Sequence, residues 1–150
     1  MFDNLERREK GKIAEFHVIS KLIASDLDLY VPVVDRGIDC VVRMEKPGKP
    51  ASYYDLQIKS ARYNNVSIRG SKKIIKYIDE RKPENYFLVI AIRKNGEYKH
   101  IIYLTAEQIR GHVYRTKKEE VDINISAEQR DLLIKSQSLD TLIGTLKDTS

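Results

Sequence analysis

The sequence has few of the residues on which several protein classes depend. It has no tryptophan, one cysteine (Cys40), four prolines and seven glycines among 150 residues. A single cysteine excludes an internal disulfide framework and a zinc finger built on cysteine pairs. The glycines are scattered, and neither GxxxxGK nor GxGxxG occurs, so no glycine-rich phosphate-binding loop is indicated.

Long apolar segments are also missing. The longest apolar run, Phe87 to Ile92, is far shorter than the ~18–20 residues that a membrane-spanning helix needs. The first residues show neither the basic nor the apolar segment of a secretory signal. We therefore expect no membrane partner and a reducing, cytoplasmic location. The length predicts one domain over residues 1–150, large enough to fold without a metal or a disulfide.

Charge is abundant, and its positive part is concentrated. Charged residues make up 33% of the chain, and the formal net charge is +5. Residues 56–78 contain no Asp or Glu. This segment carries Lys59, Arg62, Arg69, Lys72, Lys73 and Lys76, with Tyr63 and Tyr77 between them. Such a run is either a solvated face or a nucleic-acid interface.

As a nucleic-acid interface, this segment would bind mainly the backbone. Lysine and arginine contact phosphates and set affinity rather than sequence choice. The start of a predicted helix at Ser71 offers a further phosphate site, and Tyr63 is placed to stack on an exposed base.

Hydrophobic periodicity and turn residues predict an α/β chain with a core over about 5–104 and a helical C-terminal extension over 105–150. Asn95-Gly96 marks a hairpin, and Thr105 and Ser126 each begin a capping box. We expect a mixed, mainly antiparallel sheet of about five strands flanked by helices, with the last ten residues frayed. The expected elements are a helix over 5–25, strands over 29–33, 38–44 and 53–60, a helix over 71–80, strands over 86–92 and 100–104, a helix from 105, a short strand over 121–125 and a helix from 126.

Glu15 interrupts the apolar pattern of the first predicted helix. At about 100° per residue, it falls between Ile19 and Leu22, in a stripe bounded by Ala14 and Phe16 that also includes Val18 and Ile23. A carboxylate there loses hydration and must be paired, protonated or bound to a metal ion. The alternatives to a metal site are an ion pair with a core Lys or Arg, or a bend that exposes the side chain.

Two predicted strands present polar side chains at alternate positions. Asp39 lies on one face of its strand, and Gln57 and Lys59 share one face of the next. If these faces coincide, they form one patch that the first helix extends with Glu15. Asp35 is a second candidate acid, but it precedes the turn at Gly37, whereas Asp39 lies within a strand. The alternative is an ordinary hairpin with a solvated polar face.

Such a patch has a definite chemistry. Carboxylate and amide oxygens are hard ligands that suit Mg²⁺ or Mn²⁺. A bound cation activates water and stabilises charge on a phosphate. A neighbouring lysine, Lys59, would orient that water and neutralise developing negative charge.

The order and spacing of these residues carry a family resemblance. Glu15, then Asp39 at the end of Asp35-Arg36-Gly37-Ile38-Asp39, then Gln57-Ile58-Lys59-Ser60 resembles the PD-(D/E)XK nuclease superfamily. The third-strand motif is similar to that of the branch that reads QxK, and the layout is similar to that of archaeal Holliday-junction resolvases. The resemblance covers roughly Lys10 to Ile92.

This resemblance implies a restriction-endonuclease-like αβββαβ core and a Mg²⁺- or Mn²⁺-dependent DNA endonuclease. It implies that Asp39, Gln57 and the backbone carbonyl of Ile58 hold the metal ion. Glu15 would be the helix carboxylate of the active site, and Lys59 the catalytic lysine. A homodimer would suit such an enzyme, since one site cuts one strand. Because Gln57 replaces the family's usual acid, the alternative is a catalytically degenerate nuclease-fold module that binds DNA or a protein partner without turnover.

Overall fold

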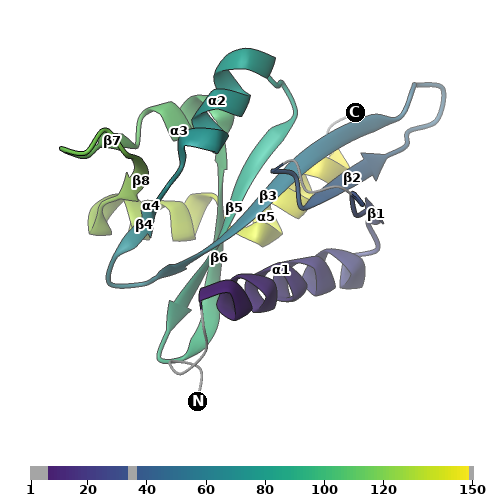
Figure 1. The fold of residues 1–150 in the computed structure, drawn as a ribbon. Helices are drawn as coiled ribbons and strands as arrows, with labels where there is room; N and C mark the ends of the chain where they lie inside the picture. Colours follow the sequence, from purple (N-terminus) through teal and green to yellow (C-terminus); the bar gives the residue numbers. More distant parts are fainter. Residues whose placement is uncertain (1–6, 34–36, 149–150) are drawn as a thin grey trace.

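The computed structural model describes residues 7–33 and 37–148, and Figure 1 shows how its helices and strands are arranged. The candidate acid Asp35 lies outside the described residues. The elements are α1 (Arg7–Ala24), β1 (Asp28–Tyr30), β2 (Cys40–Met44), β3 (Ser52–Arg62), β4 (Val66–Ile68), α2 (Lys72–Arg81), β5 (Tyr86–Lys94), β6 (Glu97–Thr105), α3 (Ala106–Arg110), β7 (Val113–Arg115), β8 (Val121–Ile125), α4 (Ala127–Ser136) and α5 (Leu139–Asp148).

The main sheet has five strands in the order β1-β2-β3-β5-β6. Only β3 and β5 run parallel, because the chain crosses over through β4 and α2 between them. The other neighbours are antiparallel, so the predicted mixed sheet is confirmed. Residues 88–92 of β5 are all buried, as expected of a central strand covered on both faces. Asn95 and Gly96 both have positive φ, which confirms the hairpin between β5 and β6.

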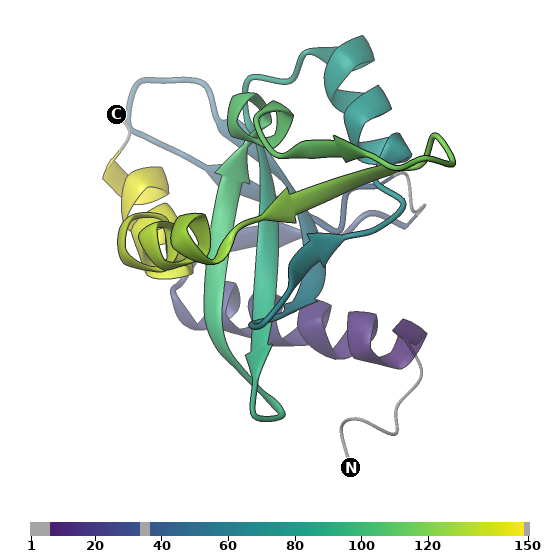
Figure 2. The same cartoon turned by 90° about the vertical axis from the view of Figure 1, so that its left-hand side faces the viewer.

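Each face of the main sheet carries its own hydrophobic core. One face packs against α1 and α5, through Ala14, Val18, Leu22, Leu139, Leu142 and Leu146. The other face packs against α2, α3, α4 and a second sheet of order β4-β8-β7, which lies in front of the main sheet in Figure 2. The alternation of side chains along β3 therefore decides which core each residue enters.

The region after residue 105 differs in part from the expectation. The strand at 121–125 and the capping box of Thr105 and Gln108 are present. Ser126 caps its helix by accepting from Gln129 N, which is one of the two bonds of the expected box. Two three-residue strands, β4 and β7, were not foreseen, because runs this short leave little periodic signal. The expected fraying of the last ten residues is wrong for those that are described. They belong to α5, whose Leu142 and Leu146 are buried against the sheet.

Candidate active site

Asp39 directly precedes β2, at the place where the longer strand β3 continues without β2 beside it. The pairing ends at Cys40 opposite Leu56, whereas β3 continues to Arg62. Asp39 donates its backbone N–H to the carbonyl of Leu56 at 2.9 Å, and its Oδ2 accepts from the N–H of Ile58 at 2.6 Å. The carboxylate therefore takes the place of a β2 backbone group along this edge. Because the N–H and C=O of a strand residue point to the same side, the Ile58 carbonyl faces the same edge.

Glu15 reaches Asp39 from α1. The pKa of Asp39 is raised to about 6, mainly because burial removes water from its charged form. The Ile58 N–H opposes this shift, Glu15 adds to it by hydrogen bonding and repulsion, and Lys59 opposes it. The two carboxyl groups therefore lie together, and the ammonium group of Lys59 is close enough to Asp39 to lower its pKa.

Glu15 lies at the flank of the buried stripe of α1 rather than in its middle. The side chains that face the sheet are Ala14, next to Glu15, Val18, about one turn from it, and Leu22, about two turns from it. The Glu15 side chain is 23% exposed and its Oε2 lies 3.0 Å from Lys12 Nζ, on the same helix. Phe16 and Ile23, which were expected in the stripe, are 69% and 60% exposed on the outer side of the helix.

Gln57 is anchored in the opposite core. It is 8% exposed, and its Oε1 accepts a hydrogen bond from the hydroxyl of Tyr86 at 2.7 Å. Tyr86 belongs to the core on the α2 side, whereas Leu56 and Ile58 belong to the core on the α1 side. Asp39 still acts on the Tyr86 hydroxyl, because its charge contributes, after burial and Tyr77, to the raised pKa of Tyr86. Asp39 therefore lies at the strand edge between Glu15 and the Tyr86–Gln57 pair.

The oxygens of these side chains are of the kind that bind a hard divalent cation. Within residues 7–33 and 37–148, no three acidic, histidine or cysteine side chains gather into a metal-binding group. Glu15 and Asp39 supply two carboxylates whose mutual repulsion a cation would relieve. Gln57 Oε1 and the Ile58 carbonyl are neutral oxygen donors of the kind that Mg²⁺ and Mn²⁺ accept. The donor set thus suits a hard cation, with one negative charge fewer than three acids would give.

A cationic groove of about 540 Å³ begins at Lys59. Its charged lining residues are all basic: Lys10, Lys59, Arg62, Arg69 and Arg93. Sequence reasoning found three of these but missed Lys10 and Arg93. The parallel register, which places Arg93 beside Arg62, and the packing of α1 bring them in, and no local pattern reveals either.

Tyr98 of β6 holds the wall of this groove together. Its hydroxyl donates to the backbone carbonyl of Lys10 at 3.1 Å and lies 3.0 Å from the hydroxyl of Ser60. The first turns of α1 are thereby tied to β3 next to Lys59. This contact helps to fix the position of α1 relative to β3, and Glu15 lies five residues further along the same helix.

The remaining predicted nucleic-acid residues divide into two sets. Arg62 and Arg69 are exposed and line the groove, whereas the exposed Lys72, Lys73 and Lys76 lie on α2, outside its lining. Lys76 also lies 3.9 Å from Glu80.

Two expected contacts are already occupied within the chain. Tyr63 is not an open stacking platform, because the Arg130 guanidinium lies 3.7 Å and the Lys94 amine 4.3 Å from its ring centroid. Ser71 is buried and its hydroxyl donates to the Ile68 carbonyl, so it neither caps α2 with its side chain nor offers that hydroxyl to a phosphate.

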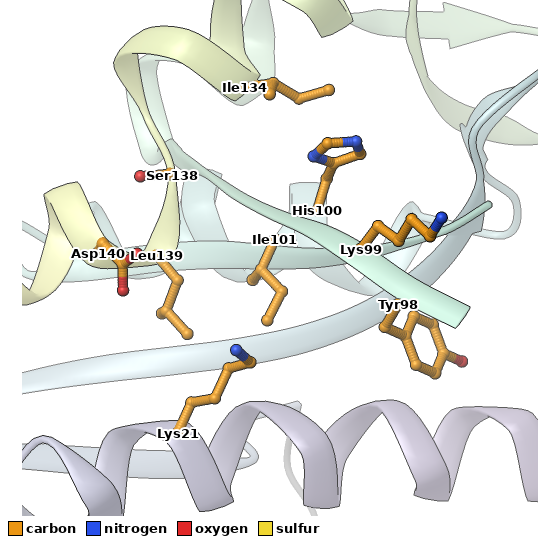
Figure 3. Close-up of a pocket in the computed structure, with 9 residues that line it drawn as sticks. All are labelled: Lys21, Tyr98, Lys99, His100, Ile101, Ile134, Ser138, Leu139 and Asp140. Atoms are coloured by element: carbon orange, nitrogen blue, oxygen red, sulfur yellow. The ribbon is translucent and has the colours of Figure 1, made fainter.

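A second hollow, of about 130 Å³, lies elsewhere on the molecule. Figure 3 shows side chains from α1, β6 and the α4–α5 region around it, including Lys21, His100 and Asp140. None of its nine lining residues is a predicted site residue. The acidic pair and the cationic groove therefore remain the candidate site.

Comparison with known proteins supports the fold rather than a particular activity. No protein-family model matches the sequence, and no curated protein matches it. Among solved structures, Hjc of Archaeoglobus fulgidus, a Holliday junction resolvase, matches with a TM-score of 0.54 at 10% identity, over 94% of this chain and 99% of that one. A bacterial homing endonuclease matches with a TM-score of 0.58 at 14% identity, over 97% of this chain and all of that one.

The chain therefore has the restriction-endonuclease-like fold of PD-(D/E)XK nucleases, as the sequence resemblance implied. Both matches extend over nearly the whole length, so the elements after residue 105 belong to the compared region as well. No helix in the described part of the chain is long and apolar enough to cross a membrane.

Proposed function

We propose that this chain is a divalent-metal-dependent endonuclease that hydrolyses phosphodiester bonds in DNA. One relationship carries the proposal: Lys59 lines the cationic groove and also lies close enough to Asp39 to lower the pKa of that carboxyl, which Glu15 raises. A polyanionic strand bound in that groove would pass the two carboxylates. Neighbours of this fold that are named as a Holliday junction resolvase and a homing endonuclease support the assignment.

The residues of the site divide the work. Glu15, Asp39, Gln57 and the Ile58 carbonyl would hold Mg²⁺ or Mn²⁺. When bound, such an ion supplies an activated water and charge neutralisation at the phosphate. Lys59 orients the attacking water and neutralises charge that develops on the phosphate oxygens. Arg62, Arg69, Arg93 and Lys10 hold the strand through its phosphates, without reading its bases.

Nicking of supercoiled plasmid and of branched DNA tests the proposal. Wild type with Mg²⁺ or Mn²⁺ should cut, the metal-free protein should not, and Lys59→Ala should lose at least ~100-fold in rate, the scale of a lost electrostatic stabiliser. Lys72→Ala is the matched control, since this exposed lysine lies outside the groove lining. Equal background cleavage by wild type and Lys59→Ala would refute the enzymatic assignment.

A binding module without turnover is the second candidate. It is favoured by the site's having two carboxylates and a neutral amide, Gln57, instead of a third acid. Titration with Mn²⁺ separates the two candidates. Salt-sensitive DNA binding by a protein that takes up no Mn²⁺ identifies the module, whereas Mn²⁺ binding that Asp39→Asn weakens supports the nuclease.

Dimerisation belongs to the same proposal. One site cuts one strand, so two copies would be needed to cut both strands of a duplex in a single encounter. Sedimentation of the protein with and without duplex DNA measures this directly.

A further inference from the structure

Tyr86 is a buried phenol whose hydroxyl serves a single side chain. It begins β5 and is the only tyrosine that is fully buried within the described ranges 7–33 and 37–148. A buried tyrosine hydroxyl needs a hydrogen-bond partner, because an unsatisfied one costs about 1–3 kcal/mol. Its partner is Gln57 Oε1, 2.7 Å away. For packing alone, phenylalanine would fill the same space, so the hydroxyl has a separate use.

Strand pairing brings the two side chains together. In the parallel register of β3 and β5, Tyr86 lies opposite Asp55, and Gln57 lies two residues further along the same face. The ring of Tyr86 is held from the other side by Tyr77 of α2, with ring centroids 5.4 Å apart. Tyr77 in turn donates its hydroxyl to Asp55 Oδ2 at 3.2 Å. The phenol is therefore clamped between a strand and a helix, and its donor direction is set.

This clamp determines which end of the Gln57 amide occupies which place. A terminal amide can rotate to exchange its oxygen and nitrogen, and only the oxygen can be a metal ligand. The Tyr86 hydroxyl favours the orientation with the oxygen toward it. A carbonyl oxygen has two acceptor positions, so accepting from Tyr86 leaves one for a cation. The Nε2 end lies toward Gly37, where a Cβ would stand 4.0 Å away, at ordinary contact distance.

We propose that Tyr86 is a positioning residue of the metal site, acting through Gln57 by holding its carbonyl oxygen in place. The inference rests on the proposed function, since it concerns the same cation. Residues that orient a metal ligand through a hydrogen bond typically change metal affinity or activity by 10–100-fold when they are removed. Orientation is important for Gln57 because only one end of a neutral amide can bind a metal ion, whereas either oxygen of a carboxylate can.

Isothermal titration with Mn²⁺ alone, on the full chain, tests the role of Tyr86. Tyr86→Phe should bind Mn²⁺ about 10–100-fold more weakly than wild type. Tyr77→Phe is the matched control: it loses the neighbouring hydroxyl, leaves the Tyr86–Gln57 bond intact and should bind as wild type does. In the metal-free protein, the side-chain amide signals of Gln57 in a ¹⁵N NMR spectrum should shift in Tyr86→Phe and stay in place in Tyr77→Phe.

A second pair of variants keeps the test independent of folding defects. Gln57→Leu, alone and combined with Tyr86→Phe, removes the amide through which Tyr86 acts. The two should bind Mn²⁺ equally weakly, and the double variant, which lacks the Tyr86 hydroxyl that Gln57→Leu leaves unpaired, should be the more stable. Wild-type affinity in Tyr86→Phe, with affinity lost in Asp39→Asn, overturns the role of Tyr86 alone. No Mn²⁺ binding by wild type overturns the metal site and, with it, this role.

Discussion

The carboxylate of Asp39 accepts the backbone N–H of Ile58 at 2.6 Å, at the edge of β3 where β2 has ended. This bond keeps an acid in a partly dehydrated place beside a second acid, Glu15. Elsewhere in a fold such an arrangement would be selected against, since it disfavours the charged form. Here it leaves two acids near Lys59, which also lines the cationic groove, and the arrangement has measurable consequences.

Asp39 should make the free energy of unfolding depend on pH. Its pKa is about 6 when folded against 3.8 as the ordinary value, so the folded chain binds the proton more tightly. The stabilising contribution of the protonated form is complete below pH 3.8 and is lost as the pH rises through about 6. The shift sets an upper limit of about 3 kcal/mol, which partial solvent exposure reduces to ~1–2 kcal/mol.

Asp39→Asn should remove this dependence. Its amide oxygen still accepts from Ile58 N–H, so the variant should be ~1–2 kcal/mol more stable than wild type at pH 7.5 in the absence of metal, with no gain at pH 4. Urea unfolding at several pH values measures the difference. Parallel pH profiles for the two proteins would contradict the expectation.

Glu15→Gln should lower the pKa of Asp39. Glu15 raises this pKa through its charge, and a glutamine removes that charge while its amide can donate to the Asp39 carboxylate. Titration of the Asp39 carboxyl carbon by NMR measures the shift. Glu9→Gln is the control, because this exposed acid on the same helix is not among the groups that shift Asp39. An unchanged Asp39 pKa in Glu15→Gln would show that the two carboxyls do not interact.

Arg69→Ala should weaken DNA binding in a salt-dependent way. Each phosphate contact contributes about 0.9 to the slope of log K against log salt concentration for duplex DNA, so the slope should become shallower by about that amount. Fluorescence anisotropy with a labelled duplex, from about 50 to 200 mM salt, measures it. Lys117→Ala, at an exposed lysine outside the groove lining, should leave the slope as it is. An unchanged slope for Arg69→Ala with a shallower slope for Lys117→Ala would show that DNA binds outside the groove.

Leu142→Ala should show that α5 belongs to the core. This side chain is fully buried between α5 and the sheet, so its truncation should cost about 2–5 kcal/mol of unfolding free energy. The exposed Leu132 of α4 supplies the matched substitution, which should stay within about 0.5 kcal/mol of wild type. A loss for Leu142→Ala no larger than that for Leu132→Ala would mean that α5 is not packed as described.

Local signals in the sequence were sufficient for the elements. A buried strand at Tyr86 to Ile92, a hairpin at Asn95-Gly96 and helix N-caps at Thr105 and Ser126 depend on neighbours within a few residues, and the structure has all of them. The same holds for the spacing of Glu15, Asp39, Gln57 and Lys59, whose likeness to PD-(D/E)XK nucleases led to the fold that the comparisons support. Helix periodicity failed at Phe16 and Ile23, because it locates an apolar stripe but not which part of the stripe the sheet covers.

Contacts between distant segments were decided only by the tertiary structure. The register of β3 with β5 places Tyr86 on Gln57 and Arg93 beside Arg62, and the packing of α1 brings Lys10 into the groove. The packing of α4 places Arg130 against the Tyr63 ring. Leu139, Leu142 and Leu146 of α5 have the spacing of an amphipathic helix, but only the tertiary structure shows which core they enter. The physical reason is that hydrogen-bond registers and helix docking are set by burial summed over the whole chain, whereas propensity and capping act within a turn or two.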